Sequence, residues 1–112
     1  MKFHGTPDAE GVSVCHCGQC RRQSGHLWAS AHAPNEAVKI EGEVRWYRSS
    51  DHAQRGFCPT CGSFLFWKDA RDPHTSFSLG ALEKPTGARL ARHIFTSDKG
   101  DYYDITDGLP QK

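Results

Sequence analysis

Short runs of alternating hydrophobic and polar residues, separated by glycine, proline and charged residues, are spread along the whole chain. A period of two residues is typical of β-strands, and frequent turn residues between short strands favour antiparallel pairing. We therefore expect a mainly β fold with little helix. The pattern predicts strands at Met1–His4, Val12–Val14, His26–Ala33, Val38–Ile40, Val44–Arg48, Thr75–Leu82 and Arg89–Phe95, and a hairpin over Arg55–Trp67.

Helix is expected at a single place. Arg21–Gly25 reads as a helical turn that ends at Gly25, because glycine readily takes the left-handed conformation that closes a helix. Ser49–Gln54 and Asp69–His74 are polar and are expected to be loops. The tail from Ser97 onward is also polar, and its possible anchors are Tyr102, Tyr103 and Ile105.

The composition describes one small domain that covers residues 1–112. Hydrophobic residues make up 37% of the chain, which allows a modest core that would gain from a metal. The net charge of +1 gives no strong field for nucleic acid or an anionic membrane. The start of the chain lacks the apolar segment of a signal peptide, so we expect a cytoplasmic protein in which clustered cysteines bind metal.

Three of the five cysteines fall within six residues, Cys15-His16-Cys17-Gly18-Gln19-Cys20. Two cysteines one residue apart are poorly placed for a disulfide, whereas a tight loop can turn three thiolates toward one soft cation such as zinc. Cys15, Cys17 and Cys20, here called the cysteine triad, are therefore predicted metal ligands. The fourth ligand is either a distant side chain, as in structural sites, or an open position, as in catalytic ones. His16 is not expected to be a ligand, because adjacent side chains diverge.

Cys58 and Cys61 form a second motif, C-P-x-C, between two hydrophobic runs. The pair is typical of half a zinc site, although a C-x-x-C pair can also be redox-active. The flanking residues read as strands rather than as a helix, which favours the metal interpretation. The pair needs two further ligands, and the sequence leaves their source open.

Four residues after the triad are candidates for contact with a ligand. Arg21 and Arg22 could offset the negative charge of a zinc held by three thiolates, or could be solvated surface residues. His26 and Trp28 could line a cavity beside the triad, or simply pack in the fold.

The two cysteine motifs together, C-H-C-G-Q-C-R-R-Q-S-G from Cys15 and R-G-F-C-P-T-C-G-S-F-L-F-W from Arg55, resemble the GFA family. This group is named for the glutathione-dependent formaldehyde-activating enzyme and includes the centromere protein V type. The resemblance implies a β-tent fold of small antiparallel sheets around zinc. It implies a catalytic zinc on the triad, and half of a structural zinc on Cys58 and Cys61. Family members usually carry another C-x-C-G before a strand like Met1–Phe3, and this sequence begins just after that position. Either its start is truncated or misassigned, or the protein lacks half of the second site.

The resemblance also implies an activity. We expect a zinc-dependent carbon–sulfur lyase that forms S-hydroxymethylglutathione from glutathione and formaldehyde, with Arg21 or Arg22 on a glutathione carboxylate. One alternative is a non-catalytic, zinc-stabilised β scaffold that binds a protein or a small thiol, and another is a thiol redox protein. The expected partners are a small thiol and an aldehyde, without nucleic acid or membrane, and a second copy could complete the Cys58–Cys61 site in a homodimer.

Overall fold

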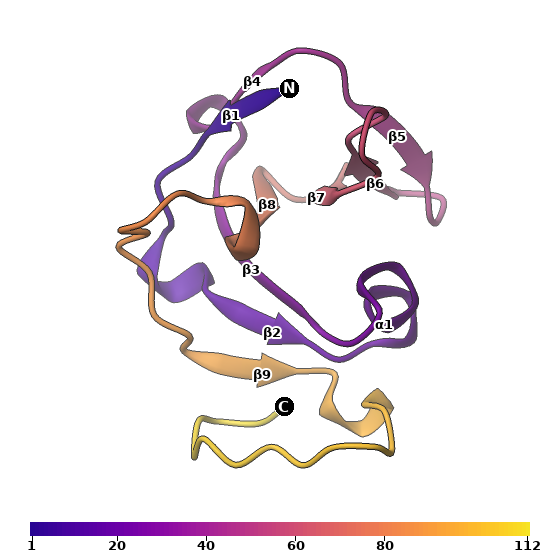
Figure 1. Ribbon diagram of the computed structural model, residues 1–112, viewed down its shortest axis with the longest axis vertical. Helices are drawn as coiled ribbons and strands as arrows, with labels where there is room; N and C mark the ends of the chain where they lie inside the picture. The colour runs from indigo at the N-terminus through magenta and orange to yellow at the C-terminus, as the bar shows by residue number, and fades with distance from the viewer.

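The chain folds into nine short strands and one short α-helix, joined by loops and 3-10 turns (Figure 1). The computed structural model describes all residues, 1–112. The strands are β1 (Lys2–His4), β2 (Ser13–Cys15), β3 (Trp28–Pro34), β4 (Lys39–Glu41), β5 (Arg45–Arg48), β6 (Ala53–Phe57), β7 (Phe64–Asp69), β8 (His74–Ser78) and β9 (Arg92–Ile94). The helix α1 (Gly18–Ser24) has seven residues, and no helix has the length and apolar character needed to cross a membrane.

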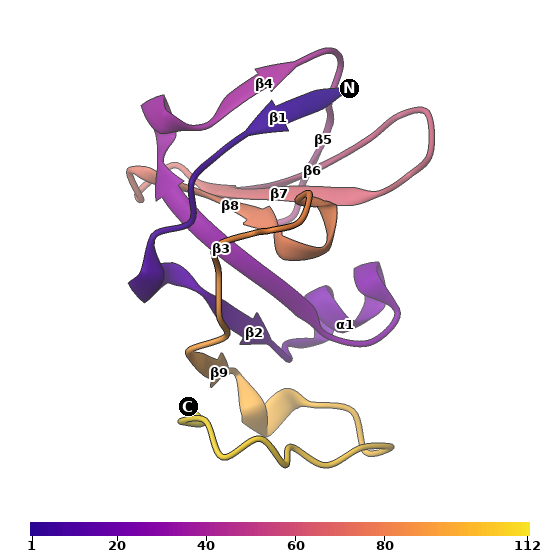
Figure 2. The same cartoon turned by 60° about the vertical axis from the view of Figure 1, so that its left-hand side comes forward.

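Seven of the strands form one sheet in the order β5-β6-β7-β8-β3-β2-β9, and β1 and β4 pair separately. All neighbours are antiparallel except β2 and β9, which run parallel. The β1–β4 pair and the N-terminus lie at one end of the molecule, whereas β9 and the C-terminal tail lie at the other (Figures 1 and 2). The helix α1 follows β2 directly, so the triad sits where the sheet meets the helix.

The main core lies where β7, β8 and β3 meet the small β1–β4 sheet. Phe66 on β7 is paired with Phe77 on β8, and both side chains are fully buried. Phe3 on β1 packs edge-on against Phe66, with the ring centroids 5.0 Å apart. The alternating sequence brings these aromatic side chains together, because every second residue of a strand points to the same face of the sheet.

The expected mainly β architecture is confirmed, and Gly25 ends α1 in a left-handed conformation with φ of 84°. The helix begins earlier than predicted, at Gly18, because the Cys17 side chain caps it. The predicted strand over Thr75–Leu82 is too long: β8 ends at Ser78, and a 3-10 turn follows. A glycine within this turn explains the break in pairing.

The predicted loops at 49–54 and 69–74 are also too long. Ala53 and Gln54 belong to β6, where they pair with Asp69 and Lys68 of β7. His74 likewise begins β8. These strand ends carry polar side chains that neighbouring groups satisfy, as in the hydrogen bond between His52 Nδ1 and Asp69 at 2.9 Å. The hydrophobic pattern therefore did not predict these strand ends, because their side chains are polar.

Candidate metal centre

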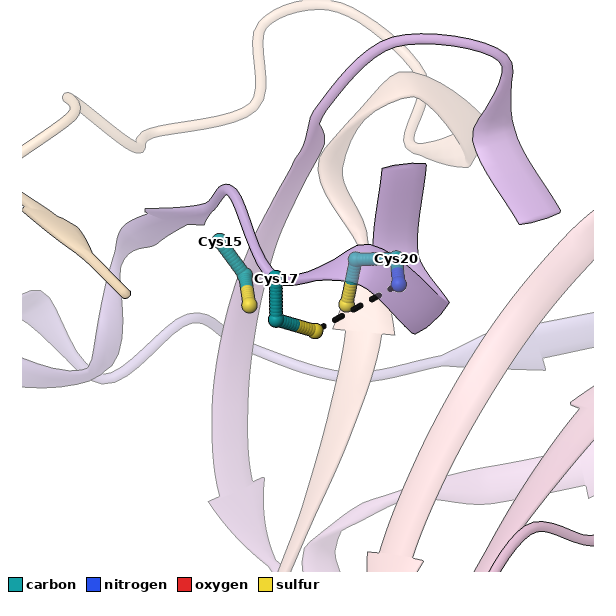
Figure 3. A group of neighbouring side chains, drawn as sticks. All are labelled: Cys15, Cys17 and Cys20. Atoms are coloured by element: carbon teal, nitrogen blue, oxygen red, sulfur yellow. Dashed lines mark hydrogen bonds between the residues drawn. The ribbon is translucent and has the colours of Figure 1, made fainter. Parts of the chain in front are cut away.

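The three sulfurs of the cysteine triad converge on one point. Their Sγ atoms all lie within 4.8 Å of one another, and Figure 3 shows the side chains leaving the loop toward the same side. Cys15 is the last residue of β2, Cys17 is the N-cap of α1, and Cys20 lies in the first turn. A strand end and a helix start therefore hold the ligands, and the sequence between them is too short to let them separate.

Local hydrogen bonds fix this loop. The Cys20 backbone N–H donates to Cys17 Sγ at 3.4 Å, so one sulfur replaces the oxygen of an ordinary helix cap (Figure 3). The His16 backbone N–H donates to the Ile94 carbonyl at 3.1 Å, which fastens the loop to the end of β9. Cys15 and Cys20 are buried, whereas Cys17 is half-buried. The sulfurs are thus preorganised before any ion binds.

Two of the thiols have perturbed acidities. A hydrogen bond between Cys15 and Cys20 raises the pKa of Cys15 and lowers that of Cys20, so the proton stays on Cys15. Burial raises the pKa of Cys15 further. Arg55 also lowers the pKa of Cys20, because its guanidinium Nη1 donates to Cys20 Sγ at 3.4 Å. One thiolate is therefore favoured at this site even without a metal.

The donor set fits zinc. Zinc–sulfur bonds of about 2.3 Å in a tetrahedron place sulfurs roughly 3.8 Å apart, which small side-chain movements reach from the observed spacing. No fourth His, Cys, Asp or Glu joins the cluster. Three thiolates and one divalent ion carry a net charge of −1, and the Arg55 guanidinium is placed to balance it.

The triad opens onto a cavity of about 520 Å³, a volume typical of small-molecule sites. Apolar side chains of this cavity pack directly against the triad: Trp28 is buried with Cys15 and Cys20, and Trp67 and Ile94 contact that cluster. The Trp28 ring is fixed by a hydrogen bond from Nε1 to Ser78 Oγ at 2.6 Å. A ligand at the open position of the metal would therefore enter a preformed pocket.

Comparison with known proteins agrees with this geometry. The family model described as glutathione-dependent formaldehyde-activating enzyme matches residues 1–98. The chain belongs to this family, GFA. A protein of Schizosaccharomyces pombe described as an uncharacterized lyase is 26% identical over 106 residues, which cover 86% of this chain and 72% of that protein. Family membership and this relative support an enzyme of the lyase class.

A solved structure supports the fold alone. A Rhodobacter sphaeroides protein superposes with a TM-score of 0.56 at 22% identity, covering 74% of this chain and 78% of that one.

Four side chains beside the triad form a hydrogen-bonded row, and two of them, Tyr103 and Asp107, lie after the residues that the GFA model matches. His93 Nε2 donates to Asp107 at 2.9 Å, and in the neutral ring His93 Nδ1 then accepts from His16 Nε2, also at 2.9 Å. His16 Nδ1 then accepts from the Tyr103 hydroxyl. Both ring nitrogens of His16 are occupied, so it is not free to bind a metal. The row ties the C-terminal tail to the triad loop, and nothing local in the sequence reveals it.

The four other candidates from the sequence do not all reach the cavity. Trp28 lines the cavity, whereas Arg21, Arg22 and His26 are not among its lining residues. His26 instead contacts the tail, where Nδ1 hydrogen-bonds with the Tyr102 hydroxyl at 3.1 Å. Arg55 was missed as a site residue because it is far from the triad in sequence. The available signal was its place at the start of the R-G-F-C-P motif.

Cys58 and Cys61 sit at the tip of the β6–β7 hairpin, as the motif predicts. The turn is closed by the Gly62 N–H, which donates to the Cys58 carbonyl at 2.8 Å. Both thiols face a second cavity, of about 760 Å³, which His4 also lines. No third ligand converges with them, so their role as metal ligands stays a prediction.

Proposed function

We propose that this protein is a zinc-dependent carbon–sulfur lyase that makes and breaks the bond between a thiol and an aldehyde. The proposed substrates are glutathione and formaldehyde, which give S-hydroxymethylglutathione. The observation that carries the proposal is the triad of convergent sulfurs with a cavity at its open side. Family membership supports this choice of substrate class.

Cys15, Cys17 and Cys20 would hold the zinc. Zinc bound by three thiolates supplies Lewis acidity and lowers the pKa of a thiol that enters its fourth position. In the synthetic direction a thiolate attacks the carbonyl carbon, a C–S bond forms, and the carbonyl π pair moves to oxygen. That oxygen takes up the proton that the thiol released, so no external oxidant or reductant is needed.

The residues of this chain prepare that step in two ways. The Arg55 guanidinium, held by Cys20 Sγ and by Gln23 Oε1 at 3.2 Å, keeps a positive charge beside the sulfurs. The aromatic wall of Trp28 and Trp67 limits access of water to the reacting carbon. The apolar wall strengthens the electrostatic effect of the Arg55 charge, because such surroundings are less polarisable than water.

A non-catalytic zinc scaffold is the main alternative. A scaffold has its fourth position closed by a protein side chain, and no such side chain lies with the triad. The open cavity therefore favours an enzyme over a scaffold.

Two measurements test the proposal. Native mass spectrometry should give a zinc bound to the wild-type chain, and exchange NMR should show that the zinc-loaded protein accelerates exchange between glutathione and its formaldehyde adduct. Cys17→Ser should lose both properties, whereas Ser24→Ala, at the exposed end of α1, should keep both. A Cys17→Ser protein with full zinc content and full exchange rate would contradict the mechanism.

A further inference from the structure

The cavity beside the triad is lined asymmetrically, with its apolar surface next to the sulfurs. Trp28, Trp67 and Ile94 all pack with the buried cysteine cluster and line the cavity, so they border the space that a carbon attached to the substrate sulfur would enter. A hydroxymethyl group is small and polar and would leave these side chains facing water. The wall therefore matches a larger, apolar substituent at this carbon.

Phe95 adds a second, independent observation. It is 57% exposed and lines the same cavity. Its backbone is left-handed, with φ of 54° and ψ of 40°, and it is the sole residue other than glycine with positive φ. Bulky side chains rarely adopt this conformation, and such strain is concentrated at functional positions.

The backbone on both sides of Phe95 is held in place. Ile94 accepts a hydrogen bond from the His16 backbone, and the Thr96 N–H donates to the Lys112 carbonyl at 2.9 Å. The Phe95 carbonyl accepts from the Asp98 N–H at 3.1 Å. The fold therefore imposes the unusual conformation, and its result is an exposed aromatic ring at the edge of the cavity.

The charges that line the cavity do not select one sign of substrate. Arg55 and Arg92 face it from one set of elements, and Asp72 and Asp98 from another. Arg92 Nη1 is already engaged by the Glu10 carbonyl. With Arg55 already paired with the triad and Arg92 with the Glu10 carbonyl, shape and apolar contact decide which group is accepted next to the sulfur.

We propose that the preferred substrate of this site is a thiol adduct of an apolar, aromatic aldehyde larger than formaldehyde, with its ring held between Phe95 and the Trp28–Trp67 wall. The inference rests on the proposed function for the chemistry. The bond changes are the same: the C–S bond forms at the carbonyl carbon, and the resulting oxygen takes the proton of the thiol.

Stable thioethers test the cavity without turnover. The zinc-loaded protein is titrated calorimetrically with S-benzylglutathione and with S-methylglutathione, which differ in the group on sulfur. Burial of a phenyl ring predicts that the benzyl compound binds roughly 10-fold to 100-fold more tightly. Phe95→Ala should lose most of this preference, and Tyr47→Ala, which removes an exposed aromatic ring outside the cavity, should retain it.

The outcomes separate this inference from the proposed function. Equal affinity for the two compounds, no binding of either, or a preference unchanged in Phe95→Ala would overturn the inference. Exchange of the formaldehyde adduct with no benzyl preference would leave the proposed function standing alone. Strong benzyl preference with no exchange of any adduct would support the cavity assignment and refute the lyase.

Discussion

Replacing Arg55 with methionine should separate the stability of the fold from the chemistry of the triad. Arg55 is buried, and its Nη1 donates to Cys20 Sγ at 3.4 Å and to Gln23 Oε1 at 3.2 Å. Its Nε has no hydrogen-bond partner, and its guanidinium carbon lies 5.7 Å from the centre of the Phe64 ring. The side chain thus has favourable contacts and one unsatisfied donor.

Opposing effects make the expected change in folding stability small. Hydrogen bonds to charged groups contribute about 1.5–3 kcal/mol each, which the substitution removes. Methionine relieves the unsatisfied Nε and packs its thioether against Phe64. The Cys20 sulfur that loses its partner can take up a proton in the metal-free protein, so no buried charge is left without compensation. We expect the free energy of unfolding of the metal-free protein to change by about 1 kcal/mol or less.

The thiol chemistry should change more. In the wild type the pKa of Cys20 is lowered first by the hydrogen bond from Cys15 and then by Arg55. Without the guanidinium the pKa of Cys20 should rise, because two of the effects that lower it, the hydrogen bond and the charge of Arg55, are lost while the burial that raises it remains. The uncompensated charge on the thiolates should also weaken zinc binding, by about 10-fold to 100-fold if the effect resembles loss of other groups around metal ligands.

The assay is a thiolate absorbance titration of the reduced, metal-free protein, with zinc affinity from chelator competition and stability from urea unfolding. Arg48→Met is the matched control, because Arg48 is exposed on β5 and contacts only the Asp51 carbonyl through Nη2. Unchanged thiol acidity and zinc affinity in Arg55→Met would refute the electrostatic role. A stability loss well above 3 kcal/mol would instead identify Arg55 as mainly structural.

Three further results are expected. The free energy of unfolding should fall as the pH drops below about 6.5, because burial lowers the pKa of His16 and the unfolded chain therefore takes up this proton first. It should fall further below pH 3.8, because the hydrogen bond with His93 lowers the pKa of Asp107 in the folded protein. Urea unfolding that shows no dependence on pH would contradict both. Gly56→Ala should destabilise the fold by about 1–3 kcal/mol in thermal unfolding, since the added Cβ would lie 2.9 Å from the Trp46 ring. Cadmium titration should produce a thiolate charge-transfer band that weakens when any one triad cysteine becomes serine.

The sequence predicts the strands well where hydrophobic alternation is strong and poorly where tertiary contacts replace it. Phe64–Trp67 and Phe77 read correctly as strand residues because their side chains fill the core. The polar residues Gln54 and Asp69 belong to strands because backbone pairing includes both, and hydrogen bonds from Arg71 satisfy the Asp69 carboxylate. The parallel β2–β9 pair joins segments that are far apart in the chain, and no local pattern predicts such a pair.

The candidate site divides in the same way. The convergence of the triad was predictable because its three cysteines fall within one hexapeptide, where spacing alone restricts the geometry. Arg55 and Phe95 were not predicted as site residues, since each reaches the cavity from another strand or its end. His93 reads as an ordinary strand histidine, yet it is buried and bonded to both His16 and Asp107.

Local sequence and long-range structure therefore control different properties of this centre. The hexapeptide supplies the sulfurs, so other chains with the same spacing should also be able to bind metal. The charge beside the sulfurs comes from β6, and the aromatic edge of the cavity comes from the residue after β9. Thiol acidity and the shape of the accepted substrate depend on these distant positions. A match to the cysteine motif therefore indicates a metal site, whereas Arg55 and Phe95 indicate which chemistry and which substrate that site favours.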